Sequence, residues 1–215
     1  MPNNSYNKYA KFMNKVFYAN NNLIHLLPKI SAYLGFFILT IYIPFVSFIP
    51  IIPKLVTVTY LPFIMTFAIC NLGFLGALVT GLGFGFSSWL VAIIYGFSIR
   101  YQYFDIAVLP RIINALIIYF LYLIFRFKNK PKIQVFIFLS ILATILNVVL
   151  TVSATYLRHN LIKPIPTVLP FKFWFIRHIP SMIIEPIFAG AISSWTYKFL
   201  IFINEQNQNY KKIIY

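Results

Sequence analysis

The sequence predicts an all-α integral membrane protein, built as a bundle of six transmembrane helices. Of its 215 residues, 60% are hydrophobic and only 10% are charged, whereas a soluble domain is about half apolar and about a quarter charged. The apolar residues gather in stretches of about 20, which is the length that crosses a bilayer as a helix. Only Asp105, Glu185 and Glu205 are acidic, against 18 Lys and Arg. We attribute this positive excess to loops that contact the lipid bilayer, and not to nucleic-acid binding.

The apolar stretches define one membrane domain over residues 30–203. The six spans are expected near residues 30–48, 56–70, 73–97, 106–125, 133–156 and 179–203. The sequence IPIIPKL at 49–55 is expected to be a proline-punctuated turn, and Pro62 interrupts the second and shortest span. Residues 204–215 form a polar tail. Residues 1–29 are expected either to lie on the membrane as an amphipathic helix or to form a disordered tail.

The connections between the later spans differ in character, and their charges predict the orientation. Residues 98–105 form a polar, aromatic loop, 126–132 a tight basic loop and 157–178 a long loop with several prolines. An even number of spans puts both ends on one side of the membrane. That side carries eleven Lys and Arg against six on the other. The positive-inside rule therefore places both ends in the cytoplasm, with the protein in the cell membrane.

Two charged residues fall at membrane depth. Arg111 follows Pro110 at the start of the fourth span, with Asn114 three residues later on the same helix face, and Glu185 precedes Pro186 in the sixth. A charge at this depth costs a few kcal/mol and indicates a functional site by default. Arg111 and Glu185 either form an ion pair that joins two helices, or Arg111 binds the carboxylate or phosphate of a solute. A third possibility is that Arg111 extends to the membrane interface.

The fifth span carries a polar stripe at spacings of three and four residues. Such a stripe lies on one helix face and should face protein or a water-filled cavity, because lipid offers no hydrogen bonds. Small hydroxyl groups commonly serve helix–helix contacts, but the amide of Asn147 has more hydrogen-bonding groups to satisfy. The stripe consists of Ser140, Thr144, Asn147, Thr151 and Thr155.

Aromatic residues are concentrated on the two loops assigned to the outer side. Most of them are expected to form an interfacial belt. Tyr103 and Trp174 are the best candidates for stacking on a bound ligand.

The glycine-rich run GFLGALVTGLGFGFSSWL (73–90) predicts a smooth helix face. A dinucleotide fingerprint would need a third glycine where Phe86 stands, and no Gly-Lys-Ser/Thr occurs for a nucleotide loop. Small residues instead recur every four positions, a spacing that lets helix backbones approach closely. They are Gly73, Ala77, Gly81 and Gly85. Cys70 is the lone cysteine, and we expect no metal site, no cofactor and no catalytic residue.

The order of these features resembles that of the substrate-binding (S) components of energy-coupling-factor (ECF) vitamin transporters. The resemblance is carried by YIPFVSFIPIIPKLVTVTYLPFIMTFAICNLGFLGALVTGLGFGFSSWL, by VLPRIINALIIYFLY and by IPSMIIEPIFAGAISSWTYKFL. Many relatives have an acidic residue where this chain has Phe86-Ser87-Ser88. The alanine-rich coupling motif of the first helix is reduced to Ser31, Ala32 and Gly35.

The resemblance implies a non-enzymatic six-helix subunit that captures a vitamin near the outer face. It implies that a transmembrane coupling subunit and two ATPase subunits supply the energy. The implied pocket residues are Arg111, Asn114, Asn147, Glu185 and Trp174, to which we add Tyr103. The implied docking surface for the coupling subunit consists of Ala32, Gly35, Gly73, Ala77, Gly81 and Gly85. We expect an anionic vitamin, similar to folate or pantothenate, that is attracted by the outer-loop charges.

Three other classes of protein compete with this interpretation. A self-sufficient secondary transporter or channel predicts ion-coupling acids near the midplane and internal repeats, but the spans hold a single acid. A membrane enzyme needs clustered acids or histidines. A structural membrane protein has no need of Arg111 and Glu185.

Overall fold

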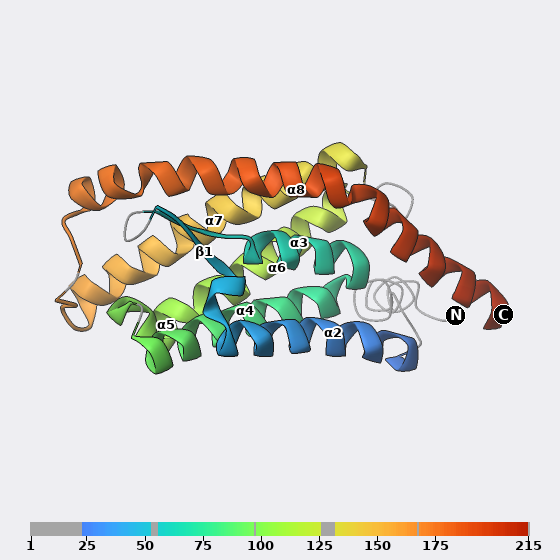
Figure 1. Cartoon of the computed structure of the whole chain (residues 1–215), viewed down its shortest axis with the longest axis horizontal. Helices are drawn as coiled ribbons and strands as arrows, with labels where there is room; N and C mark the ends of the chain where they lie inside the picture. Colours follow the sequence, from blue (N-terminus) through green and yellow to red (C-terminus); the bar gives the residue numbers. More distant parts are fainter. Residues whose placement is uncertain (1–22, 53–55, 97, 126–131, 167, 215) are drawn as a thin grey trace, which may run out of the picture.

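The computed structural model describes residues 23–52, 56–96, 98–125, 132–166 and 168–214. Most of the surface helix or tail expected over residues 1–29 and of the basic loop expected over 126–132 lies outside these residues, although residues 23–29 belong to the first described helix. The described chain forms an elongated bundle of helices (Figure 1). The helices are α2 (Leu23–Tyr42), α3 (Leu61–Leu72), α4 (Phe74–Tyr95), α5 (Phe104–Ala107), α6 (Leu109–Phe125), α7 (Ile133–Leu161) and α8 (Phe171–Ile214).

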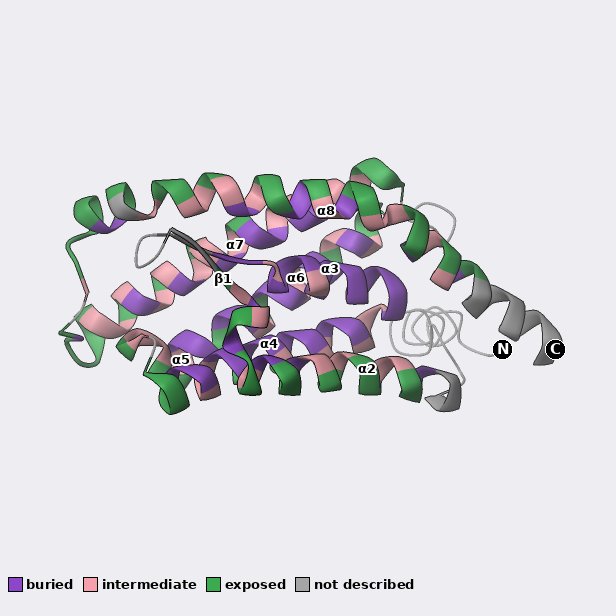
Figure 2. Ribbon diagram, in the orientation of Figure 1, coloured by how far each residue is buried: buried purple, intermediate pink, exposed green. Residues whose placement is uncertain are grey.

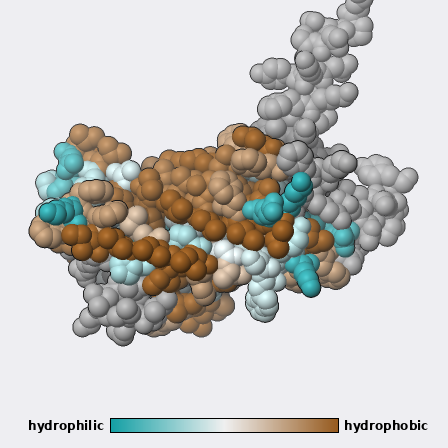
Figure 3. All heavy atoms as spheres, turned by 90° about the horizontal axis from the view of Figure 1, so that it is seen from above, coloured by the Kyte–Doolittle hydropathy of each residue, from teal (hydrophilic) through white to brown (hydrophobic). Residues whose placement is uncertain are grey.

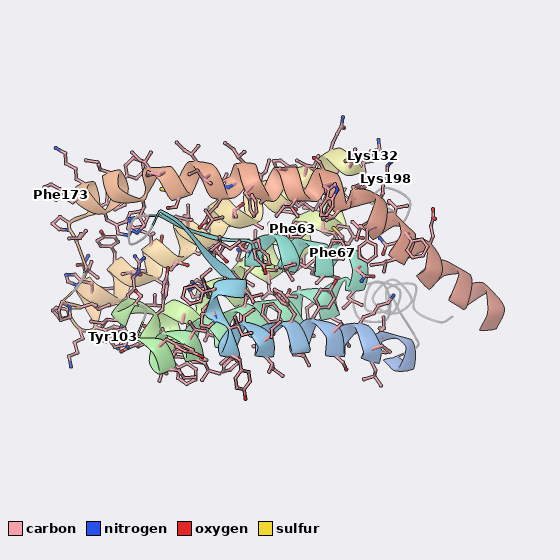
Figure 4. The ribbon with its side chains drawn as sticks, viewed as in Figure 1. Phe63, Phe67, Tyr103, Lys132, Phe173 and Lys198 are labelled. Carbon is pink, nitrogen blue, oxygen red and sulfur yellow. The ribbon has the colours of Figure 1, made fainter. Side chains whose placement is uncertain are left out.

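The long helices pack in a continuous series. α2 lies on α4, α4 on α6, α6 on α7 and α7 on α8, while α3 lies inside and contacts α4, α6, α7 and α8. α2 begins and α8 ends at the same end of the bundle, which we call the terminal end (Figure 1). The opposite end, the loop end, holds the 3-10 helix η2 (Ile99–Gln102), α5 and the connection from α7 to α8. Lys132 and Lys198 lie toward the terminal end (Figure 4).

Four helical stretches among the described residues are long and apolar enough to cross a membrane. They are Phe74–Tyr95, Phe104–Phe125, Ile133–Leu161 and His178–Glu205. Two further apolar helices, Leu26–Tyr42 and Leu61–Leu72, are shorter. The outer faces of the bundle carry exposed apolar side chains, as for Trp195, which is 85% exposed (Figures 2 and 3). The chain is therefore a multi-pass helical membrane protein with four full-length spans among these residues.

The segment between α2 and α4 departs most from the sequence prediction. The prediction of a single apolar span over residues 56–70 is wrong. Instead, β1 (Phe48–Ile52) and β2 (Val56–Thr59) form an antiparallel hairpin in which Phe48 pairs with Thr59. This hairpin also qualifies the all-α prediction. Pro62 lies in the first turn of α3, where its missing N–H costs no helical hydrogen bond, so it starts the helix and does not interrupt it.

α3 is a half-length helix inside the bundle. Its 12 residues span about 18 Å, whereas the 22 residues of α4 span about 33 Å. Leu61, its first residue, packs with Phe84 near the middle of α4. α3 ends at Gly73, whose positive φ of 64° suits glycine and turns the chain directly into α4. The hairpin occupies the loop-end half that α3 leaves open (Figure 1).

Aromatic packing fixes α3 against its neighbours. Phe63 and Phe67 each place their ring centroid 6.2 Å from that of Phe136 on α7 (Figure 4). Phe136 is fully buried, and α3 is buried along nearly its whole length (Figure 2). α3 thus lies at the centre of the apolar core.

The small-residue face of α4 packs inside the bundle. A Cβ atom added at Gly81 would lie 2.9 Å from the Cβ of Ala115 on α6, and one at Gly85 would lie 2.9 Å from the Cα of Val108. Ala77 is also buried. These three positions belong to the predicted docking surface, but all three are buried, and at Gly81 and Gly85 only a small residue admits the neighbouring chain so closely.

The other proposed docking positions are placed differently. Gly73 is the hinge between α3 and α4, with no atom near an added Cβ. Ala32 and Gly35 lie exposed on α2. Of the predicted docking surface, these two residues of α2 are exposed, and Gly73 is half-buried.

The polar stripe on the fifth span faces protein, as predicted. Three of its threonines donate to carbonyl oxygens of α7 itself, which satisfies their hydroxyls without a second helix. Ser140, Thr144, Asn147, Thr151 and Thr155 are all buried. α7 extends to Leu161 and α8 begins at Phe171, so the loop expected over 157–178 is much shorter. α8 also continues through residues 204–214, where a separate tail was expected.

Replacement of Gly81 by leucine should destabilise the protein. The new side chain would overlap Ala115 and the backbone of Ile112, and overpacking of this kind costs about 1–3 kcal/mol. The thermal unfolding midpoint of the detergent-solubilised protein measures the effect. Gly35→Leu is the matched control, because no atom lies within 4 Å of an added Cβ there. Equal midpoints for the two variants would contradict the internal packing of α4.

Candidate functional site

The buried cation at the loop end is Arg111, in the first turn of α6. Its side chain is 3% exposed, and Nη1 donates a 2.6 Å hydrogen bond to the carbonyl oxygen of Ile106. The guanidinium carbon lies 4.9 Å from the ring centroid of Tyr101 and 5.4 Å from that of Phe84. Both rings present their negative faces to a cation at such distances. α5 and η2, which precede α6 in the chain, supply Ile106 and Tyr101.

No carboxylate neutralises Arg111 among the described residues. Its Nε has no hydrogen-bond partner, and Glu185 forms no ion pair with it. Arg100 lies close enough to add a second positive charge. A carbonyl oxygen and two ring faces compensate a buried guanidinium only in part, so a site with net positive charge results.

Glu185 accepts a hydrogen bond from the backbone of the hairpin. Its Oε1 accepts the N–H of Thr59 at 3.3 Å, and the Thr59 Oγ1 accepts the N–H of Leu61 at the same distance. Leu61 is the first residue of α3, where backbone N–H groups lack helical partners, and Thr59 ends β2 two residues earlier, near the helix end whose dipole favours a negative charge. The intramembrane acid therefore joins α8 to the beginning of the half-length helix.

Tyr101 connects the two charges electrostatically. Burial of the Tyr101 hydroxyl and the nearby negative charge of Glu185 both raise its pKa. The positive charges of Arg100 and Arg111, together with the hydrogen bond from Arg111, lower it by more. The pKa of Tyr101 is therefore below its ordinary value. We call the group Thr59, Phe84, Tyr101, Arg111 and Glu185 the half-helix cluster. Its members come from five elements that meet where α3 begins.

Asn114 and Asn147 lie deeper, at the contact of α6 with α7. Asn114 is fully buried, and its Nδ2 donates to the carbonyl oxygen of Ala143 at 2.9 Å. Asn147 is 7% exposed and lies one helical turn from Ala143. The Oδ1 atoms of both asparagines have no hydrogen-bond partner. Asn114 thus lies about one turn from Arg111 on the terminal side, while Asn147 lies on α7 at about the level of Arg111.

Tyr103 lies apart from the cluster in a second charged group. The guanidinium carbon of Arg158 lies 4.0 Å from its ring centroid, and Arg158 also binds both oxygens of Asp105 at 2.7 and 2.8 Å. Figure 4 shows Tyr103 at the loop end. This ion pair, in which Nη1 alone donates to both carboxylate oxygens, neutralises one of the outer-loop charges expected to attract a solute. It also ties α5 to the end of α7.

Trp174 belongs to the first turn of α8 and not to a loop. Its indole ring stacks on His178, with centroids 4.3 Å apart, and more loosely on Phe171. The indole is 8% exposed. Neighbours on its own helix therefore occupy its faces, and no contact joins it to Arg111.

Three members of the half-helix cluster, Thr59, Phe84 and Tyr101, were missed by sequence reasoning as binding candidates. Phe84 lies in the glycine-rich run, which was interpreted only as a packing face. Tyr101 was counted among the loop aromatics, but nothing in SIRYQYFD distinguishes it from Tyr103. Thr59 lies three residues before Pro62, which was interpreted as an interruption of a span. Its contact with Glu185 depends on the hairpin, which the sequence analysis did not predict. Within the described part of the chain, no three His, Cys, Asp or Glu side chains gather as a potential metal site.

Comparison of the chain with family models, with curated proteins and with solved structures finds no match. The geometry of the half-helix cluster is therefore the basis for assigning a function. Chemically, the cluster offers a buried guanidinium, two aromatic faces and a carboxylate in one place.

Tyr101 should ionise below the ordinary pKa of a tyrosine. Because the pKa of Tyr101 is lower in the folded than in the unfolded protein, its ionisation adds stability as pH rises toward the ordinary tyrosine value of about 10. Absorbance at 295 nm should show an early step of one tyrosine. The step should vanish in Tyr101→Phe and persist in Tyr103→Phe. An unchanged titration in Tyr101→Phe would contradict the contact with Arg111.

Proposed function

We propose that this protein is the membrane-embedded substrate-capture subunit of an ECF-type vitamin uptake transporter. The vitamin is small and anionic, similar to folate or pantothenate, and binds at the half-helix cluster. The observation that carries the proposal is the buried guanidinium of Arg111 without a carboxylate partner. The subunit captures its solute and catalyses no reaction.

An anionic solute supplies what the cluster lacks. Removing a charge from water costs several kcal/mol, and a bound carboxylate repays this through charge-assisted hydrogen bonds to Nε and the remaining guanidinium N–H groups. The rings of Tyr101 and Phe84 lie within 5.4 Å of the guanidinium carbon, and Nε still lacks a hydrogen-bond acceptor. Arg100 raises the local potential and favours arrival of an anion.

The ECF assignment rests on the sequence resemblance and on the exposed side of α2. Under this proposal the loop end faces outward and the terminal end lies in the cytoplasm, with the protein in the cell membrane. A transmembrane coupling subunit docks on α2 around Ala32 and Gly35, both of which are exposed. Two ATPase subunits then supply the energy for release of the solute.

A self-sufficient secondary transporter is the second candidate, and one observation favours it. α3 is a half-length helix that begins inside the bundle, with Glu185 at its start, and such broken helices form coupling sites in many transporters. Liposomes containing the chain alone distinguish the two functions. Uptake of a solute driven by an ion gradient, with no other subunit, would exclude the ECF proposal.

Arg111→Gln should weaken vitamin binding about 10- to 100-fold, the effect of losing a charge-assisted hydrogen bond. Thermal shift with a vitamin panel identifies the solute, and equilibrium dialysis measures its affinity. Arg158→Gln is the matched control at the same end, because Asp105 already neutralises Arg158. We expect it to bind normally.

Two outcomes would contradict this assignment. The first is an absence of stabilisation by any vitamin, and the second is equal affinity in wild-type protein and Arg111→Gln. Purification from membranes that also contain a coupling subunit and ATPases tests the partners. We expect all three to be recovered together with this chain.

A further inference from the structure

Among the described residues, seven buried side-chain polar atoms have no hydrogen-bond partner, and four of them lie on neighbouring turns of α6 and α7. These four belong to residues no more than 7% exposed: Arg111 Nε, Asn114 Oδ1, Asn147 Oδ1 and Ser140 Oγ. The other three are the hydroxyls of Ser47 and Ser88 and the Nε of Arg158. Thr144, Thr151 and Thr155, on the same stripe of α7, are all bonded to their own helix. Missing partners are therefore a property of this contact and not of the whole stripe. A buried polar atom normally has a partner, so each unpaired one requires an explanation.

The four atoms follow one another along the two helices. The hydrogen bond from Asn114 to the Ala143 carbonyl sets the level of α6 against α7. The helices run in opposite directions (Figure 1), and Arg111 and Asn147 each lie about one turn from this bond toward the loop end. Ser140 lies about one turn from it toward the terminal end. Arg111 and Asn147 thus occupy one level, Asn114 the next and Ser140 the last.

The chemistry of the atoms changes along this row. Arg111 Nε is a donor that requires an acceptor, whereas the two amide Oδ1 atoms are acceptors that require donors. The amide of Asn114 is oriented by its Nδ2 bond, because a flipped amide would turn Oδ1 toward a carbonyl oxygen. A metal cation on these oxygens is disfavoured, since the Arg111 charge lies about one turn away. A carboxylate alone would satisfy Arg111 and leave the amide oxygens unpaired.

We infer that the α6–α7 contact is a deeper part of the binding site, where Asn114 and Asn147 select solutes by their hydrogen-bond donors. The solute class is a small carboxylic acid that carries N–H or O–H groups within about one helical turn, roughly 5 Å, of its carboxylate. This inference rests on the proposed function, because the carboxylate is held by Arg111. Ser140, at the far end of the row, accepts or donates to the same solute.

The test compares carboxylic acids with and without such donors. Pantothenate, folate and biotin carry N–H groups, whereas lipoate and octanoate carry an acid and no other donor. Equilibrium dialysis against the detergent-solubilised full chain measures each affinity. We expect at least one donor-bearing acid to bind about tenfold or more tightly than lipoate and octanoate. Asn147→Leu should abolish this preference.

Thr151→Val is the matched control on the same face of α7. Its hydroxyl already donates to the backbone carbonyl oxygen of Asn147, so the preference should persist. Thermal unfolding without solute shows which variants are folded, and Asn147→Ser replaces Asn147→Leu if the latter unfolds. Asn147→Ser shortens the side chain and should reduce the preference.

The outcomes separate this inference from the proposed function. If Arg111→Gln abolishes binding and both Asn147 variants keep the full preference for donors, the capture function stands and the donor selection is wrong. If wild-type protein binds acids of both kinds equally, water fills the contact and the inference is overturned. If no acid binds at all, both proposals fail.

Discussion

A polar group inside a bilayer must find its partner within the protein, because lipid offers none. The chain meets this constraint in an unusual place, where the hairpin ends and α3 begins halfway along the bundle. The N–H of Thr59 donates a hydrogen bond to Glu185, and the N–H of Leu61 donates one to the Thr59 hydroxyl. Pro62 has no N–H that needs an acceptor. Glu185 is thus committed to the backbone, and its negative charge lies at the favourable end of a helix. Without this acceptor the extended segment would carry an unpaired N–H at membrane depth.

The commitment of Glu185 has a consequence for Arg111. An ion pair between them would neutralise the loop-end half of the bundle, but each takes different partners. Arg111 contacts a carbonyl oxygen and two aromatic rings, while Asp105 forms an ion pair with Arg158. Both acids at this end are therefore occupied, and the remaining positive charge is best matched by an anion from outside. The function that we propose follows from this distribution of partners.

Sequence reasoning located the features that depend on local periodicity. The polar stripe of α7 is buried as its spacing indicates, and Gly81 and Gly85 form a smooth face because small residues recur every four positions. It failed where an element depends on distant partners. The hairpin is held partly by α8, 126 residues away at the Thr59–Glu185 bond, and no pattern near Thr59 records that contact. Likewise, Tyr101 and Tyr103 are equivalent in sequence, and only the approach of Arg111 and Arg158 gives them different environments.

A double-mutant cycle of Arg111→Gln and Glu185→Gln tests the central claim, which is that no carboxylate neutralises Arg111 in the solute-free protein. The measured quantity is the coupling free energy in thermal or steric-trap unfolding of the wild type, both single variants and the double variant. We predict near additivity, with a coupling of about 0.5 kcal/mol or less, as for residues without direct contact. A coupling above about 1.5 kcal/mol would show a buried ion pair. In that case Arg111 is already satisfied and has no charge to offer a solute.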